Sequence, residues 1–304
     1  MINSSKKNIL YIHQYFKTPN EPGGTRSYWI AKKMIEKGFN VTILTSKNNI
    51  KSNVFKKNID NITVIYLNID YDQKMSVFRR LISFIDFSLK SLIQVFKLRN
   101  YYHKIYATST PLTVALPALF AYFILGKKFI FEVRDLWPEV PIQMGAIKNK
   151  FLIRLLKKIE LITYQKAEKI IALSPGMYDG VVSLINSENK VYMIPNMSKP
   201  QDFYLRKKNK SILNKYNFKD SYLNIIYFGS IGKANGLLKV VDYFYKLEHK
   251  KIHLYIAGDG SEKDNIMYAC NKRKQSNISF IGNHKMSDLS EIINCCDLSL
   301  ISFL

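Results

Sequence analysis

The chain has 304 residues, enough for about two domains, and its 47% hydrophobic and 23% charged residues are ordinary for a globular protein. The formal net charge of +23 is not ordinary, and it favours a nucleic acid, an anionic membrane or a phosphorylated substrate as partner. A Lys- and Asn-rich coding bias can account for part of that excess. Three cysteines exclude a disulfide framework and indicate a reducing compartment.

The N-terminal residues show no long apolar core and no small-residue cleavage site, so we expect no signal peptide and a cytoplasmic protein. The most apolar stretch, residues 111–126, is short for a membrane span and is interrupted by Pro111 and Pro117. It is therefore predicted to be a buried helix.

Strand-like and helical patterns alternate along the first two thirds of the chain. A helix is predicted at residues 25–37, with Gly38 as its C-terminal stop, and other helical patterns lie between most of the strands. Strands are predicted at residues 8–12, 41–45, 62–67, 104–107, 129–133, 169–173 and 191–194. This alternation predicts an α/β fold, a doubly wound and mostly parallel sheet over residues 1–197.

The polar, Lys-rich segment 198–221 interrupts the alternation, and we interpret it as an interdomain connection. The alternation then restarts, with strands at 223–228, 252–257, 278–281 and 298–301 and helices at 237–248, 262–274 and 288–294. A second domain as large as the first would need more strands. Residues 222–304 are therefore predicted to form part of a second Rossmann-like domain.

One long helix is predicted at residues 75–99, rich in Phe, Leu and Ile but marked by a narrow polar stripe. It is either a core helix of the first domain with one wet edge, or a helix at a membrane interface. In the second case Arg79, Arg80, Lys90 and Lys97 would meet anionic head groups. The stripe comprises Arg79, Ser83, Asp86, Lys90, Gln94 and Lys97.

Ligands of open parallel sheets bind beyond the carboxyl ends of the strands, so the loops that follow the strands are the candidates for chemistry. After the first strand, Gly23 and Gly24 precede a helix, where a phosphate or a sugar hydroxyl can approach the backbone. The alternative interpretation is a turn followed by an N-cap at Thr25.

The strand at 129–133 leads directly into a polar stretch. Asp135 could accept a proton from an attacking hydroxyl or fix that hydroxyl by a hydrogen bond. Arg134 could pair with Asp135 or Glu139, or bind an anion. Trp137 offers a flat face for a sugar ring. The alternative is a structural network of Arg134 with the carboxylates, with Trp137 in the core.

The second domain opens with a strand followed by a glycine-rich loop, in which Lys233 supplies a cation for a diphosphate. The next strand ends in Gly258-Asp259-Gly260, where Asp259 could bond a ribose hydroxyl or cap a helix. The glycine spacing is not G-x-G-x-x-G, so the match to a nicotinamide dinucleotide fingerprint is loose. The five histidines show no metal-ligand spacing, and no metal site is predicted.

Several motifs together resemble family 4 glycosyltransferases of the GT-B fold, in the bacterial branch that assembles O-antigen or capsule and includes L-fucosamine (amino-sugar) transferases. They occur in the family's order from residue 8 to residue 301. The motifs read "KKMIEKGFNVTILTS", "EVRDLWPEVPIQMGAIKN", "IIALSPGM", "YMIPNM", "YFGSIGKANGLLKVV" and "IAGDGSEKD".

The resemblance implies retaining transfer from a nucleotide-sugar, UDP-linked, without a catalytic metal or other cofactor. The acceptor would be a lipid-linked saccharide, the enzyme being peripheral on the inner face of the cytoplasmic membrane. Asp135 and Arg134 would lie at the reacting centre, with Gly23, Gly24, Trp137 and Glu139 on the acceptor side. The donor-binding residues would be Gly229, Ser230, Gly232 and Lys233 at the diphosphate and Gly258, Asp259 and Gly260 at the nucleoside.

Two departures from the family pattern affect the expected activity. Many members place an Arg and a Lys at the phosphate loop, whereas only Lys233 is evident here. The family also continues beyond the last strand into an E-x7-E segment and a final helix, so we expect a truncated chain of weak or no activity.

Two other functions stay open on the residues alone. The Gly229–Gly236 loop is compatible with an NAD(P)-dependent oxidoreductase. The charge is compatible with a non-catalytic module that binds lipid or nucleic acid, although no nucleic-acid recognition motif is evident.

Overall fold

The computed structural model describes residues 7–21, 23–72, 75–143, 145, 147–198 and 200–303. Pro22 of the Pro-Gly-Gly loop and Leu304, the last residue of the predicted second domain, lie outside the described residues. The chain divides into two compact units. Residues 1–18 and 24–197 form the first unit, and residues 19–23 and 198–304 form the second.

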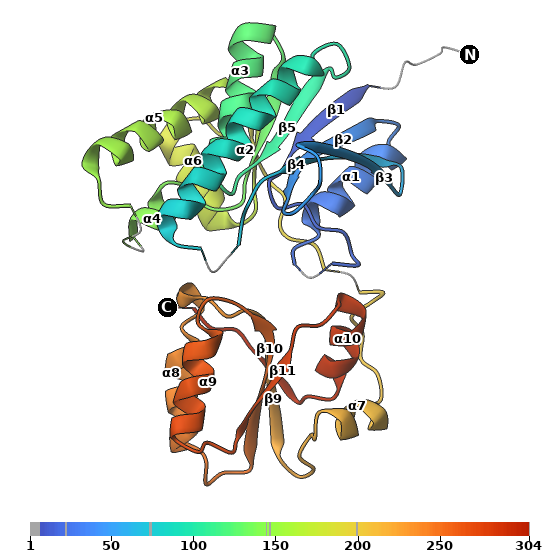
Figure 1. Ribbon diagram of the computed structural model, residues 1–304, viewed down its shortest axis with the longest axis vertical. Coiled ribbons are helices and arrows are strands. Elements are labelled where there is room, and N and C mark those ends of the chain that lie inside the picture. Colours follow the sequence, from blue (N-terminus) through green and yellow to red (C-terminus); the bar gives the residue numbers. More distant parts are fainter. Residues whose placement is uncertain are drawn as a thin grey trace. The chain divides into compact units, whose positions relative to one another are not determined.

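The first unit is built on an eight-stranded sheet in the order β3-β4-β2-β1-β5-β6-β7-β8 (Figure 1). Neighbouring strands run parallel, except that β3 and β4 are antiparallel. The strands are β1 (Asn8–Ile12), β2 (Asn40–Lys47), β3 (Val54–Ile59), β4 (Ile62–Asn68), β5 (Lys104–Thr108), β6 (Lys128–Val133), β7 (Lys169–Ala172) and β8 (Val191–Met193).

Strand β3 is absent from the sequence-based prediction because its residues, VFKKNI, lie on an exposed edge and lack the apolar run of a buried strand. Asp60 and Asn61 connect it to β4 with φ angles of 49° and 68°, the conformation of a tight hairpin turn. The two lysines within β3 protect the sheet edge from pairing with another chain.

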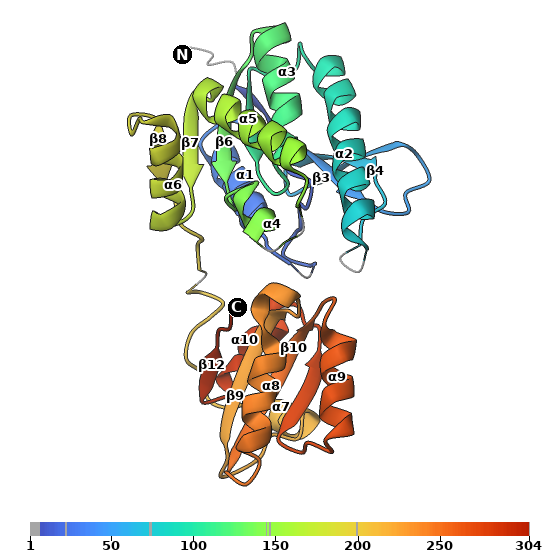
Figure 2. The same ribbon diagram turned by 90° about the vertical axis from the view of Figure 1, so that its left-hand side faces the viewer.

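Helices cover both faces of this sheet (Figures 1 and 2). Alternate residues of each strand point to opposite faces: Leu10 and Ile12 join the core beneath α2, α3, α5 and α6, and Tyr11 joins the core beneath α1. The helices are α1 (Arg26–Glu36), α2 (Val77–Lys97), the short 3₁₀ helix η1 (Leu112–Val114), α3 (Ala115–Leu125), α4 (Glu139–Gln143), α5 (Lys150–Lys166) and α6 (Pro175–Ile185).

The second unit has a four-stranded parallel sheet in the order β11-β10-β9-β12. Helices α8 and α9 pack on one face and α7 and α10 on the other. The strands are β9 (Leu223–Ser230), β10 (Ile252–Asp259), β11 (Ile278–Gly282) and β12 (Leu298–Leu300). The helices are α7 (Lys210–Lys215), the 3₁₀ helix η2 (Lys233–Asn235), α8 (Leu237–Lys246), α9 (Lys263–Lys272) and α10 (Met286–Asn294).

Part of segment 198–221, interpreted above as a connection, folds with the second unit. It contains α7, and Ile212 and Leu213 of that helix pack on the core beneath α10. Phe218 is buried and stacks on Tyr255, with ring centroids 4.1 Å apart. The high lysine content of the segment conceals these few apolar anchors.

The α/β class predicted from the alternation is confirmed in both units, each a mostly parallel sheet covered on both faces. The apolar stretch at 111–126 forms η1 and α3, which is largely buried as predicted. Over the described ranges of the chain, no helix combines the length and apolar character needed to cross a bilayer.

Candidate functional site

The carboxyl edge of the first sheet brings three polar loops together at the point where the strand order reverses. Strand β1 has β2 on one side and β5 on the other, so the chain leaves the sheet in opposite directions around it. Such a switch point is where open α/β sheets bind ligands. His13 follows β1, Ser109 and Thr110 follow β5, and Arg134 and Asp135 follow β6.

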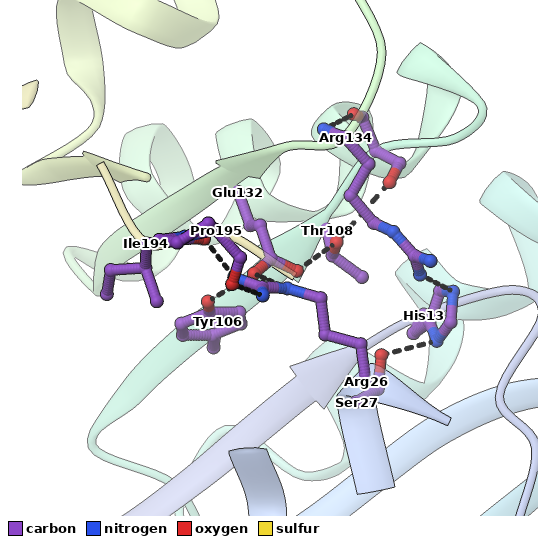
Figure 3. A network of polar contacts seen from close by, with 10 residues as sticks. His13, Arg26, Ser27, Tyr106, Thr108, Glu132, Arg134, Ile194 and Pro195 are labelled. Atoms are coloured by element: carbon purple, nitrogen blue, oxygen red, sulfur yellow. Dashed lines mark hydrogen bonds and ion pairs between the residues drawn. The ribbon is translucent and has the colours of Figure 1, made fainter. Parts of the chain in front are cut away.

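Beneath these loops, a fully buried ion pair joins four segments of the chain (Figure 3). The Glu132 carboxylate lies 2.9 Å from Nε of Arg26, and it also accepts hydrogen bonds from Tyr106 Oη at 3.0 Å and Thr108 Oγ1 at 2.6 Å. The two terminal nitrogens of Arg26 donate to the carbonyl oxygens of Pro195 at 2.6 Å and Ile194 at 2.8 Å. The ion pair and its hydrogen bonds thus hold four segments together: the first turn of α1, strand β5, strand β6, and the chain that follows β8.

Arg26 and Glu132 were not assigned a role from the sequence, although a signal was present. Glu132 is the one carboxylate within the apolar run of β6, where it faces α1 rather than the larger core. A charge at such a position needs a buried partner of opposite sign. The partner of Glu132 could not be identified from the sequence, because Arg26 lies 106 residues away. In the sequence, Arg26 looks like an ordinary residue in the first turn of a helix.

Arg134 contacts a histidine rather than a carboxylate (Figure 3). Its Nη1 lies 3.0 Å from Nε2 of His13, and Nδ1 of His13 lies 2.8 Å from Oγ of Ser27. A guanidinium only donates, so Nε2 is the acceptor and the ring is the neutral Nδ1–H tautomer. Burial, followed by the Arg134 charge, lowers the pKa of His13 well below its usual value, in agreement with this tautomer.

The pairing of Arg134 with Asp135 or Glu139, considered above, is therefore not formed. Glu139 instead lies 3.5 Å from Lys157 Nζ. Within the described residues, Arg134 has no carboxylate partner, and its guanidinium donates only to neutral His13, so its charge is not balanced by a nearby anion. A guanidinium in this state is a good binding group for an incoming anion.

Asp135 is held by a neighbouring strand end and remains partly exposed. Thr110 Oγ1 donates to its Oδ2 at 2.5 Å, which leaves Oδ1 without a contact among the described residues. Trp137 is half-buried: it packs on the larger core and meets the Phe84 ring edge to face at 6.2 Å between centroids. Trp137 thus anchors the loop to α2.

The glycine pair of the first loop lies in the open. Gly23 and Gly24 are both exposed, and a Cβ built on Gly24 would lie 3.5 Å from Nη2 of Arg134. Thr25 occupies the N-cap position of α1, but its side chain makes no cap bond. The structure thus places Gly24 against Arg134 and assigns Thr25 no capping role.

In the second unit the loop after β9 carries an exposed cation. Strand β9 is where this sheet's order reverses, with β10 and β12 on its two sides. Ser230 and Lys233 are exposed, and within the described chain Lys233 makes no ion pair. The loop ends at Gly236, directly before α8. The Lys239 N–H of the first turn donates to the Gly236 carbonyl at 3.0 Å, whereas the Leu237 and Leu238 N–H groups have no backbone partner among the described residues.

A hollow of about 290 Å³ lies beside this loop. It is bounded by Gly232, Lys233 and Gly236 of the loop, by Glu262, and by aliphatic side chains of α8 and α9. A second hollow, of about 320 Å³ beside α10 and β12, is lined by none of the predicted site residues.

Gly258 and Gly260 have a packing role. Strands β9 and β10 pair Gly229 with Gly258, and the backbones approach so closely that a Cβ on Gly258 would lie 1.9 Å from the Gly229 carbonyl oxygen. A Cβ on Gly260 would lie 2.4 Å from the Ile231 carbonyl oxygen. Only glycine fits at these two positions.

Asp259 lies between them and is half-exposed. Its Oδ1 accepts a hydrogen bond from the Gly260 N–H at 2.8 Å and lies 3.9 Å from Lys263 Nζ. The N-cap of α9 is Glu262, which makes no side-chain cap bond. The cap role considered for Asp259 is therefore not formed, and its carboxylate is directed to the loop itself.

Residues 208–303 match the protein family described as "Glycosyl transferases group 1". The matched residues include the Lys233 loop and both glycines of the β10 loop. Comparison with curated protein sequences finds no match.

Solved structures of low sequence identity share the fold of the whole chain. Sucrose-phosphate synthase from Thermosynechococcus elongatus superposes with a TM-score of 0.74 at 13% identity, covering 97% of this chain and 75% of that one. The E. coli trehalose-6-phosphate structure bound with UDP-2-fluoro glucose gives 0.70 at 11% identity, covering 98% and 78%. HepE from Anabaena, in complex with UDP and glucose, gives 0.64 at 14% identity, covering 97% and 74%. These likenesses agree with the GT-B fold expected above.

Replacement of Glu132 by Ala should lower the free energy of unfolding by about 3 to 5 kcal/mol, because Arg26 would be left as a buried and unpaired charge. The matched control is Glu139→Ala, which removes an exposed pair at 3.5 Å and should cost less than about 1 kcal/mol. Urea denaturation of both variants measures the difference, and equal costs would contradict the role assigned to the buried pair.

Replacement of Gly258 by Ala should lower the free energy of unfolding by about 3 kcal/mol, because the added methyl group overlaps the Gly229 carbonyl. Gly232→Ala is the control in the neighbouring loop: its φ is −110° and the added Cβ would find only ordinary contacts, from 3.6 Å outward. A Gly258→Ala variant as stable as Gly232→Ala would show that the two strand ends can separate without loss.

Proposed function

We propose that this protein is a retaining glycosyltransferase that moves a sugar from a UDP-linked donor to a lipid-linked saccharide. The observation that carries the proposal is the Lys233 loop: an exposed cation and an open helix N-terminus follow a strand, within residues that match a glycosyltransferase family. Both features favour a diphosphate. UDP is supported by its presence in two of the similar structures.

In this proposal the second unit binds the donor. Lys233 and the first-turn N–H groups of α8 stabilise the charge that develops on the leaving diphosphate. Gly229, Ser230 and Gly232 give the diphosphate access to the backbone. Gly258 and Gly260 hold the adjoining loop close to this one, and Asp259 would then lie beside the nucleoside.

The first unit supplies the groups for the acceptor. Asp135 has one free carboxylate oxygen with which to orient the attacking hydroxyl, while Thr110 holds the other. Arg134 carries an unpaired charge suited to a phosphoryl oxygen, and neutral His13 keeps its guanidinium in place. Gly24 leaves the approach to Arg134 open, whereas Trp137 and Glu139 shape the loop.

The reaction breaks the bond between the sugar's anomeric carbon and the diphosphate oxygen and forms a bond from that carbon to the acceptor oxygen on the same face. The acceptor proton passes to the leaving phosphate, so Asp135 acts by hydrogen bonding and is not required to hold the proton. No resident metal takes part in this scheme. The proposed setting is O-antigen or capsule synthesis at the inner face of the cytoplasmic membrane, with an amino-sugar of the L-fucosamine type as donor sugar.

The proposal predicts that UDP binds the chain and that UDP-sugars release nucleotide in an acceptor-dependent manner. Lys233→Ala should reduce the turnover rate by about a hundred-fold, because one cation aimed at the developing charge is lost. Asp135→Asn should reduce it at least about ten-fold while leaving UDP binding unchanged. Isothermal titration with UDP and a nucleotide-release assay over a panel of UDP-sugars provide both measurements.

Lys272→Ala is the matched control, since it removes an exposed lysine from the last turn of α9, outside the loop. It should bind and turn over as the unmodified chain does. A chain that binds no UDP, or a Lys233→Ala variant that matches Lys272→Ala in binding and turnover, would exclude the proposed donor site.

A further inference from the structure

Helix α2 exposes a continuous apolar stripe. Six large side chains recur at intervals of three or four residues along its whole length, the spacing of one helical face. Their exposed fractions run from 48% to 72%. The stripe comprises Phe78, Ile82, Ile85, Leu89, Ile93 and Phe96.

The inner face of the same helix carries buried serines as well as apolar residues. Ser83, Ser88 and Ser91 are buried there beside Phe84 and Phe87. Two of these serines donate hydrogen bonds to the backbone: Ser83 to the Asp70 carbonyl at 2.5 Å and Ser88 to the Thr113 carbonyl at 3.1 Å. The inner face thus mixes small polar residues with apolar ones, whereas the outer row is apolar throughout.

This arrangement agrees with the first interpretation of α2 as a core helix with a polar edge, and it adds an exposed apolar row that the interpretation did not include. Of the stripe residues, Ser83 is buried, and Asp86 and Lys90 form an ion pair at 2.8 Å along the side of the helix. The outermost face is the apolar one. An exposed apolar row of this length is typical of an interaction surface.

The neighbouring helices expose further apolar side chains. Helix α2 contacts α3, and α3 contacts α5, so the three helices lie side by side on one face of the first unit (Figure 2). Phe123 and Ile124 are exposed on α3, and Phe151 and Leu155 on α5. The apolar surface therefore extends beyond one helix.

The charges around this surface are almost all positive. Helix α2 carries four cations and α5 carries five, against one carboxylate on each. Of those two carboxylates, Asp86 is paired with Lys90 and Glu160 is buried. Exposed cations include Arg79 and Lys97 on α2 and Lys150, Arg154 and Lys158 on α5.

We propose that the face formed by α2, α3 and α5 binds the surface of an anionic lipid bilayer, with the α2 stripe inserted at the level of the head groups. Apolar insertion flanked by cations is the chemistry of an interfacial helix. A second copy of the chain fits less well, because symmetric pairing of this face would bring cations against cations. Nucleic acid would match the charge but leave the apolar row exposed.

Helix α2 also contacts the loop that carries the proposed acceptor groups. Phe84, on the buried face of α2, meets Trp137, which lies two residues beyond Asp135. In the proposed function, a lipid-linked saccharide anchored in the bound bilayer would approach Asp135 from this side of the first unit. This last step rests on the proposed function, whereas bilayer binding itself does not.

The test is co-sedimentation of the full chain with phosphatidylcholine vesicles that contain or lack phosphatidylglycerol. Ile85→Asp combined with Leu89→Asp should reduce the partition coefficient at least about ten-fold on the anionic vesicles, because the inserted row is interrupted by charge. Arg79→Gln combined with Lys97→Gln should reduce it about 25-fold there, or about five-fold per cation, and leave binding to neutral vesicles unchanged.

The matched control is Tyr243→Asp combined with Tyr268→Asp, two exposed aromatic side chains on α8 and α9 of the second unit. It should bind vesicles as the unmodified chain does. Circular dichroism and thermal melting check that every variant folds, which is expected because all the replaced side chains are exposed or lie on the outer face.

Three outcomes would overturn the proposal. In the first, the unmodified chain binds no anionic vesicles. In the second, the Ile85→Asp, Leu89→Asp variant binds them as tightly as its control. In the third, the chain binds no vesicles but forms a dimer that the two aspartates dissociate. Transfer to a water-soluble, short-chain acceptor separates this proposal from the proposed function. Transfer without vesicle binding would exclude only the bilayer face, and vesicle binding without transfer would exclude only the proposed enzyme activity.

Discussion

The buried pair of Arg26 and Glu132 is the constraint on which the first unit's candidate site depends. Removing both charges from water is costly, and the structure offsets that cost by giving every polar atom of the pair a partner within hydrogen-bond distance. The pair fixes the end of β6 and the start of α1 in one arrangement. Because Arg134 and Asp135 directly follow β6, their position is set by an interaction in which neither takes part.

The second unit reaches a fixed loop geometry by a different route. There, close backbone contact takes the place of a buried ion pair. Gly258 lies so close to Gly229 that the ends of β9 and β10, and hence the loops that follow them, are held side by side. The two units thus share a plan, in which buried or backbone interactions hold the loops and exposed groups are left for chemistry. Arg134 and Lys233 are examples of the latter, each a cation without a carboxylate partner among the described residues.

The alternation of strands and helices was predictable, because buried parallel strands are short apolar runs whatever their neighbours are. The positions of Arg134, Asp135 and Lys233 at strand ends followed from the same pattern. Strand β3 and the anchoring role of Phe218 were missed, since a charged edge strand and isolated apolar residues in a Lys-rich segment carry little signal. The partners of Arg26 and His13 could not be derived, because they come from segments distant in sequence that only the fold brings together. For α2, the periodicity of the sequence separated a polar face from an apolar face. It did not show which apolar residues would be covered by the sheet and α3 and which would stay exposed.

The exposed apolar row of α2 has an evolutionary consequence. Charged or polar replacements along the outer row should cost little stability, because about half or more of each of those six side chains is exposed. Large apolar residues at all six positions would persist in related chains only under selection for something other than stability. Ser83 and Ser88 are under the opposite pressure, since their hydrogen bonds hold the helix to the neighbouring backbone at Asp70 and Thr113. Lineages that move to freely diffusing acceptors are thus free to lose the outer row while they keep the serines.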